Sequence, residues 1–261
     1  MIKLEKTSVY GFEEAIRGMR NPMNSWDKSD SGLCKGGDDG VGCSNCAAFD
    51  CQHTYDHSFQ IGKNDFELMT KLRNAGTDHR KFMRMIAVYA DITAPLYWWK
   101  EFDTYKVGTV ANSCSTMHKI HEKEFTQEDF SCEQLISDWT GKNNDAFWYK
   151  DSPENSPIDC PMMFSPLDAL RITIGVLNTN REAYLKTKDK CFWWQMIQLL
   201  PSSYNQKRTV MLNYEVLANI YKSRCGHKLD EWHEFCFWVE SLPHSELITG
   251  PFIMKKEDNN G

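Results

Sequence analysis

The second half of this sequence is built on apolar residues that recur at helical spacing, so helices must supply much of its core. The clearest helix begins at Ser165-Pro166, where an N-cap residue precedes a proline at the first helical position, and it continues through Leu167 to Val176. Further helices are expected over Lys190 to Leu200, ended by Pro201, over Val210 to Arg224, and over Leu229 to Leu242. The side chains expected in the core are Leu212, Val216, Leu217, Ile220, Tyr221, Trp232, Phe235, Cys236 and Val239.

The first half has weaker and more varied signals. A β-branched, apolar stretch before Pro95 predicts a strand over Met85 to Ile92. The other expected elements are a strand over Met1 to Thr7, helices over Phe12 to Met19, Asp65 to Arg73, Leu96 to Phe102 and Asn112 to His121, and a short helix over Ser131 to Thr140. The stretch from Asp103 to Val110 lacks good helix formers and interrupts two of these helices.

Composition limits the class of protein. The 261 residues are fewer than two average domains of roughly 150 residues, and 41% hydrophobic with 25% charged residues is typical of a folded globular chain. A net charge of −6 gives no strong nucleic-acid signal. The sequence offers neither a membrane span nor an N-terminal export signal, which indicates a cytoplasmic protein whose thiols stay reduced.

A loop rich in cysteine and histidine is expected from Asn24 to His57. Cys43 and Cys46 form a C-x-x-C pair, a spacing that suits tetrahedral zinc. Cys34 and Cys51 complete the candidate ligand set for a structural zinc ion, and a loop of unligated cysteines is the alternative.

Paired aromatic residues and two histidines invite other functional interpretations. Trp98-Trp99, Trp148-Tyr149 and Trp193-Trp194 can stack on a planar ring, but side chains of this size at helical positions favour the core or an oligomer interface. His118 and His121 lie three residues apart without an H-E-x-x-H pattern, so we expect surface residues there.

The segment from Ala94 to Met117 gathers polar groups at a helix break. It offers the cation Lys106, the thiol of Cys114, and hydroxyl groups on Thr104, Thr109, Ser113, Ser115 and Thr116. Such a set can bind phosphate, and an ordinary capped helix junction explains the same residue types.

This segment and a later one together resemble the flavin-dependent thymidylate synthases. Ala94-Pro95-Leu96-Tyr97 resembles the family's A-P-hydrophobic turn, Thr109 falls on the first serine of R-H-R-x-x-S-x-N-E-x-S-x-R-Y, and His79 falls on the histidine of G-H-x-S/T. Leu200-Pro201, Asn213, Leu217, Asn219 and Arg224 match the L-P sequence and the N-x-x-x-L-x-N-x-x-x-x-R helix. The matched stretches cover roughly residues 65–120 and 190–240.

Several motif positions depart from the family. Thr104-Tyr105-Lys106 replaces Arg-His-Arg, whose cationic groups hold the flavin and nucleotide, so that one positive charge remains. Asn112, Cys114 and Thr116 replace Glu, Ser and Arg, and Ile197 replaces an arginine. A single lysine does not reproduce bidentate guanidinium contacts, so either the ligand has changed or the site has lapsed.

The resemblance implies an α+β fold in which an antiparallel sheet packs against long helices, in a single domain over residues 1–261 with loops at about 24–60 and 141–165. It implies a homotetramer, FAD as cofactor, and one-carbon transfer from methylene-tetrahydrofolate to C5 of dUMP or a related pyrimidine nucleotide, with NADPH as reductant. The implied cofactor contacts are His79, Lys106, Asn112, Asn213 and Asn219, and the implied substrate contacts are Thr104, Thr109, Cys114, Thr116 and Arg224.

The resemblance implies one catalytic residue, and the residue types suggest a second. Arg224 matches the family arginine that contacts and polarises the pyrimidine. Cys114 can attack an electron-poor pyrimidine carbon if Lys106 lowers its pKa, and a small thiol within a packed helix is the simpler interpretation. Two alternatives remain: a non-catalytic homolog that keeps the oligomeric scaffold and binds a nucleotide or a protein partner, and a zinc-dependent protein whose functional site is the cysteine- and histidine-rich cluster of residues 34–57.

Overall fold

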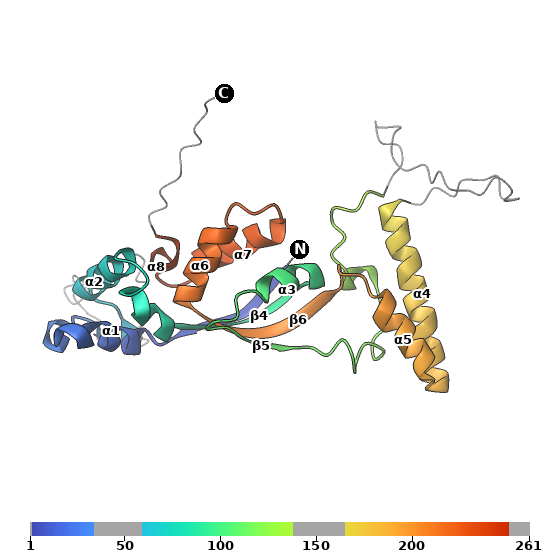
Figure 1. Ribbon diagram of the computed structural model, residues 1–261, viewed down its shortest axis with the longest axis horizontal. Coiled ribbons are helices and arrows are strands. Elements are labelled where there is room, and N and C mark those ends of the chain that lie inside the picture. Colours follow the sequence, from blue (N-terminus) through green and yellow to red (C-terminus); the bar gives the residue numbers. More distant parts are fainter. Residues whose placement is uncertain (1, 34–58, 138–164, 251–261) are drawn as a thin grey trace, which may run out of the picture. The chain divides into compact units, whose positions relative to one another are not determined.

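The computed structural model describes residues 2–33, 59–137 and 165–250 (Figure 1). These residues form two compact units. The sheet unit contains the described residues of Ile2–Thr93, Lys100–Ser113 and Lys207–Gly261, and the α4–α5 unit contains those of Ala94–Trp99 and Cys114–Gln206. The prediction of one domain with two long loops stays a prediction, since most residues of both loops lie outside the described ranges.

A four-stranded sheet has the strand order β1-β4-β6-β5. Its strands are β1 (Lys3–Tyr10), β4 (Ala87–Pro95), β5 (Val110–Ser113) and β6 (Asn205–Asn213). β1 pairs antiparallel with β4, and β5 pairs antiparallel with β6. Alternate side chains of the central strands are buried, among them Val88, Ala90, Ile92, Val210 and Leu212. This alternation gives the sheet one apolar face, as expected for an antiparallel sheet packed on a core.

Helices supply the rest of the sheet unit's core. They are α1 (Phe12–Arg20), α2 (Lys63–Asn74), α6 (Tyr214–Arg224), α7 (Asp230–Glu240) and α8 (Glu246–Thr249), with the 3₁₀ segment η4 (Arg80–Met85). α6, α7 and α8 contact one another, and α6 also contacts η4 (Figure 1). Trp232 and Phe235 of α7 are fully buried, with Phe235 packed edge-on against Phe102. The core residues expected at helical spacing in α6 and α7 are all buried.

A buried ion pair joins α1 to α2. Arg20 Nε lies 2.6 Å from Asp65 Oδ1, and the two side chains are 5% and 0% exposed. The remaining nitrogens of Arg20 donate to the carbonyl and hydroxyl oxygens of Ser25 and to the carbonyl oxygen of Lys28. Burial opposes ionisation of Asp65, but hydrogen bonds from Ser29, Ser31 and Arg20 outweigh it and hold the pKa of Asp65 below its usual value.

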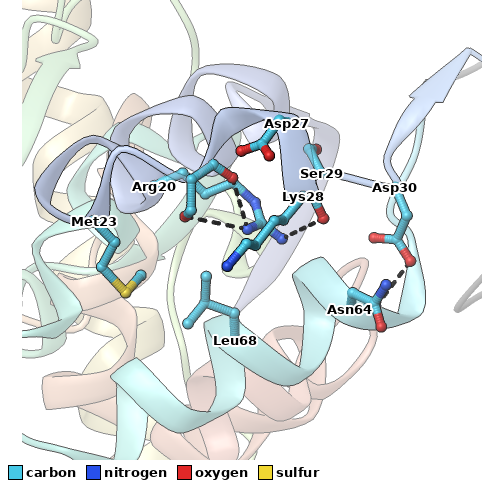
Figure 2. Close-up of a pocket in the computed structure, with 9 residues that line it drawn as sticks. Arg20, Met23, Asp27, Lys28, Ser29, Asp30, Asn64 and Leu68 are labelled. Carbon is cyan, nitrogen blue, oxygen red and sulfur yellow. Dashed lines mark hydrogen bonds between the residues drawn. The ribbon is translucent and has the colours of Figure 1, made fainter.

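Figure 2 shows the hollow beside this ion pair, which has a volume of about 730 Å³. Polar side chains from η2 (Trp26–Lys28) and from the start of α2 line it, together with the apolar Met23 and Leu68. Because the nitrogens of Arg20 all have protein partners, its guanidinium is a structural cross-link of the wall.

The segments next to this hollow close a short two-stranded sheet. β2 (Gly32–Leu33) pairs antiparallel with β3 (Phe59–Gln60). Asp30 accepts hydrogen bonds from the backbone N–H groups of Asn64 and Asp65 in the first turn of α2. A carboxylate at this position satisfies helix N–H groups that have no partner within the helix.

The α4–α5 unit contains a long helix, α4 (Pro166–Thr187), and a shorter one, α5 (Lys190–Leu199). Ser165 and Asp168 form a capping box at the start of α4, which confirms the predicted N-cap. The two helices pack around a cluster consisting of Ile120, Phe125, Phe130, Leu167, Leu170, Leu177 and Met196. Trp98 and Trp99, in α3 (Leu96–Phe102), are buried as predicted, and Trp99 Nε1 donates to Gln206 O at 2.9 Å.

Three predicted helices are wrong in part or in full. The first half of the segment from Val210 to Arg224 is strand, because β6 continues to Asn213 and α6 begins only at Tyr214. The segment from Asn112 to His121 is not helical, because Val110–Ser113 pairs with β6 as β5. No helix forms over residues 131–137, where the backbone of Ser131 is bonded to Ser203.

Two aromatic predictions are also incomplete. Trp194 is 40% exposed and packs edge-on against Trp193, so this pair is not wholly in the core. His121 is only half-exposed and packs edge-on against Tyr184, whereas His118 is exposed as expected. Trp148 and Tyr149 lie outside the described residues.

The α+β prediction is confirmed, because an antiparallel sheet and helices share one core. Within the described ranges, no helix combines the length and the apolar character that crossing a membrane requires.

Candidate functional site

Helix α6 carries three of the predicted site residues. Asn213 is its N-cap, and its Oδ1 accepts a hydrogen bond of 3.0 Å from Val216 N. Asn219 follows on an exposed position, and Arg224 is the last residue of the helix. One helix therefore positions an amide at its start, an amide at its middle and a guanidinium at its end.

The loop after α3 approaches the start of α6. Asn213 Nδ2 lies 3.5 Å from the carbonyl oxygen of Gly108. Gly108 has a φ of +76°, and a Cβ atom on it would lie 2.5 Å from Asn213 Nδ2, so only glycine fits this approach. The next residue, Thr109, has a buried Oγ1 atom without a hydrogen-bond partner among the described residues.

Arg224 is held by residues from α3 and from the loop after it. Its Nη1 lies 2.6 Å from Glu101 Oε2, and its Nε donates to the Tyr105 hydroxyl at 2.9 Å. The guanidinium lies over the ring of Trp232, 4.8 Å from the ring centroid. Its side chain is 17% exposed, and its Nη2 has no hydrogen-bond partner in the described part of the chain.

Glu101 is the centre of this cluster. Besides Arg224, its Oε2 accepts a hydrogen bond of 2.9 Å from Trp232 Nε1 and lies 3.5 Å from His227 Nε2. One carboxylate oxygen thus orients a guanidinium and an indole from two different helices. The Nη2 group of Arg224 is therefore left for another hydrogen bond, while Glu101 compensates the positive charge of the guanidinium.

Asn219 lies beside a second group of charged residues. Its Oδ1 accepts a hydrogen bond of 2.9 Å from Arg80 Nη2. Arg80 begins η4, and His79, a predicted cofactor contact, is its N-cap residue with an exposed side chain. The sheet unit therefore brings the regions of His79 and Asn219 together.

The other predicted residues of the sheet unit differ in their surroundings. Lys106 is exposed. The Thr104 hydroxyl donates to the Glu101 carbonyl at 2.7 Å, just after the end of α3. Asn112 is exposed on β5 opposite Thr209 of β6.

Cys114 and Thr116 belong to the α4–α5 unit. The thiol of Cys114 is exposed and lies outside any helix, so the interpretation as a small thiol within a packed helix is wrong. The Cys114 carbonyl accepts a hydrogen bond of 2.9 Å from Gln206 Nε2. Thr116 is half-exposed.

The predicted zinc ligands Cys34, Cys43, Cys46 and Cys51 lie outside the described residues. Elsewhere, within the residues that the structure describes, no group of three or more histidine, cysteine, aspartate or glutamate side chains is placed to hold a metal ion.

Three solved structures share the architecture of this chain. Thymidylate synthase X from Helicobacter pylori, solved with FAD and dUMP, superposes with a TM-score of 0.58 at 13% identity, covering 95% of this chain and 98% of that one. A second structure of the flavin-dependent enzyme from the same organism gives a TM-score of 0.57 at 14% identity, with the same two coverages. The chain has the fold of the flavin-dependent thymidylate synthases.

The UMP/dUMP methylase PolB from Streptomyces cacaoi, bound with 5-Br dUMP, also has this fold, with a TM-score of 0.52 at 13% identity over 95% of each chain. No family model and no curated protein matches the sequence. The flavin-dependent thymidylate synthase fold is therefore shared across nearly the whole chain, at a sequence identity of 13% to 14%.

Sequence reasoning did not identify Glu101 or Arg80 as part of these clusters. The ion pair between Glu101 and Arg224 joins residues 123 positions apart, which no local pattern signals. Trp232 had two sequence signals: it is a predicted core position, and the segment Asp230-Glu231-Trp232-His233-Glu234 resembles the family's A-Q-W-E helix, with one extra residue before it.

Proposed function

We propose that this protein is a divergent enzyme of the flavin-dependent thymidylate synthase type. It transfers a one-carbon unit to C5 of dUMP or a related pyrimidine nucleotide, with FAD, NADPH and methylene-tetrahydrofolate. The observation that carries the proposal is the fold shared over 95% of the chain with the flavin-dependent enzyme from Helicobacter pylori, in two structures solved with FAD and dUMP. The homotetramer and the cytoplasmic location belong to the same proposal.

The residues of the sheet unit fit a nucleotide ligand. Arg224 has an unbonded Nη2 edge beside the aromatic faces of Tyr105 and Trp232, which suits the carbonyl oxygen of a pyrimidine ring. Glu101 fixes the direction of that edge. In this proposal Arg224 binds and polarises the base, while Thr104, Thr109, Cys114 and Thr116 are further substrate contacts.

The cofactor contacts in this proposal are His79, Lys106, Asn112, Asn213 and Asn219. The buried and unpaired Thr109 Oγ1 next to Gly108 is a polar group that a bound ring could satisfy. When bound, reduced flavin would supply the hydride of the reaction, and the chain's side chains would orient the ring and exclude water.

A non-catalytic role is the second candidate, and the internal pairing of Arg224 favours it. Because Glu101 and Tyr105 already bind two nitrogens of Arg224, this arginine has fewer donors left for a substrate than a free guanidinium. The single lysine in place of Arg-His-Arg favours it as well.

The visible absorption spectrum of the protein, purified without added cofactor, tests the proposal. Bound flavin near one per subunit, followed by dUMP-dependent methylation, is the expected result. A colourless protein that fails to take up added FAD would overturn the enzyme proposal and leave the scaffold role.

A further inference from the structure

Two arginines of η4 share one carboxylate of α6. Arg84 donates to both carboxylate oxygens of Glu215, through Nε and, at 3.3 Å, through Nη2. Arg80 Nε lies 3.5 Å from Glu215 Oε1. Glu215 is buried in the first turn of α6, and one negative charge therefore faces two positive charges.

Arg80 has hydrogen-bond donors that the described residues do not satisfy. Its Nη2 binds Asn219, but its Nε is buried and forms no hydrogen bond with the described residues. The Arg80 side chain is only 17% exposed, so water has limited access to it. The buried Nε lies beside Glu215 and is out of reach of a ligand, so Nη1, for which the described residues supply no acceptor, is the donor left for an anion.

The surroundings keep this corner positive. Arg73 lies near enough that the charge of Arg80 adds to burial in lowering the pKa of Arg73. The nitrogens of Arg73 are bonded to Leu247, Ile248 and Asn74, so it contributes charge rather than free donors. Asp78 lies near enough to Arg84 for its charge to act on that guanidinium. Among the residues named here, three arginines are thus near two carboxylates.

We propose that Arg80 and Arg84, with the amide of Asn219, form a binding site for a diphosphate group. Two planar guanidinium forks four residues apart match a ligand that carries two linked phosphates, and a half-exposed Arg84 can turn toward it. In this site, η4 supplies the cationic groups that the sequence Thr104-Tyr105-Lys106 lacks. That the diphosphate belongs to the flavin cofactor rests on the proposed function, whereas the anion site itself does not.

The test titrates the full chain with pyrophosphate and with ADP in a calorimeter. Arg80→Gln and Arg84→Gln should each weaken binding at least about tenfold, because each removes a charge-assisted hydrogen bond. Arg17→Gln is the matched control, since Arg17 is an exposed arginine of α1 paired with Glu14, and it should bind like the wild type. Raising the salt concentration should weaken binding in the wild type.

Glu215→Gln tests whether the carboxylate competes with pyrophosphate for the two arginines. The variant removes the carboxylate that competes for both arginines, so pyrophosphate should bind several-fold more tightly. Thermal unfolding of each variant shows which remain folded. Arg84 is 56% exposed, so Arg84→Gln tests the site even if Arg80→Gln fails to fold. Wild-type protein that does not bind pyrophosphate, or folded arginine variants that bind it unchanged, would overturn the site.

Flavin uptake distinguishes this inference from the proposed function. Arginine-dependent pyrophosphate binding in a protein that takes up no FAD would support the anion site and remove the enzyme proposal. If a folded Arg84→Gln variant binds both FAD and pyrophosphate as tightly as the wild type, the anion site is wrong and the enzyme proposal stands.

Discussion

Arg224 at the end of α6 lies 2.6 Å from Glu101 of α3, in a pair whose side chains are 17% and 34% exposed. The carboxylate holds the guanidinium in one orientation and also compensates its charge. Arg224 therefore acts as an oriented hydrogen-bond donor rather than as a free cation. The carbonyl oxygen of a pyrimidine ring can accept a hydrogen bond from such an oriented donor.

Arg224→Ala should weaken the binding of dUMP by about tenfold to a hundredfold, the range expected for a lost hydrogen bond to a charged group. Isothermal titration with the wild type and the variant measures this. Arg171→Ala is a suitable control, because Arg171 is an exposed arginine of α4 paired with Asp168. Equal dUMP affinity in the variant and the wild type would show that Arg224 does not contact the nucleotide.

Asp65→Asn should lower the free energy of unfolding by about 3–5 kcal/mol, because it leaves the buried charge of Arg20 without its partner. Urea unfolding provides the measurement. Glu14→Gln breaks the exposed pair with Arg17 and should cost less than about 1 kcal/mol. A cost for Asp65→Asn as small as that of the control would mean that the pair contributes little.

Asp65 should also make the free energy of unfolding depend on pH. The pKa of Asp65 is lower in the folded protein than in the unfolded chain, so the unfolded state binds more protons in acid. The stabilisation is complete above the unfolded pKa of about 3.9 and is lost as the pH falls below it toward the folded value. Unfolding measured from pH 6 to pH 3 should therefore show a steeper loss in the wild type than in Asp65→Asn. Parallel curves would contradict this assignment.

Ser165→Ala should destabilise α4 by about 1 kcal/mol, because it removes both the cap on Asp168 N and the hydroxyl contact with the Asp168 carboxylate. Thr179→Ala, which removes only an exposed hydroxyl that donates to the Gly175 carbonyl within α4, serves as the comparison. Thermal unfolding of both variants decides whether the cap matters. A loss no larger than that of Thr179→Ala would argue against it.

Cys114→Ser should abolish any covalent adduct with a 5-halogenated pyrimidine nucleotide while the fold stays intact, if Cys114 is the nucleophile. The exposed thiol outside any helix makes the substitution structurally mild. Mass spectrometry detects the adduct, and the exposed Cys191 of α5 provides a control as Cys191→Ser. An unchanged rate of nucleotide turnover in the Cys114 variant would end the nucleophile hypothesis.

Elements with strong local signals could be predicted from the sequence. α3 has the predicted bounds, and the Ser165-Pro166 start of α4 is confirmed, because an N-cap and a turn before a helix are local chemistry. The helix predicted from Val210 is wrong over the end of β6, because Val210 and Leu212 fit an apolar helical face as well as a buried strand. Pairing with distant strands decides between helix and strand here, and a local sequence pattern carries no information about that pairing.

The candidate site could likewise be predicted only in part from the sequence. Asn213, Asn219 and Arg224 could be placed on one helix from their spacing and from the resemblance. Their partners Glu101, Gly108 and Arg80 come from other elements, more than a hundred positions away in the sequence. The side chains that orient a site arrive through tertiary folding, so spacing alone could not reveal them.

The pairing of β2 with β3 has a practical consequence for the cysteine-bearing segment between Leu33 and Phe59. Its two ends are clamped side by side, through Leu33 opposite Phe59 and through Asp30 on the first turn of α2. Because Leu33 and Phe59 are already paired, a two-residue hairpin turn can join them directly. A chain shortened in this way would show whether the rest of the protein needs the thiols of residues 34–58.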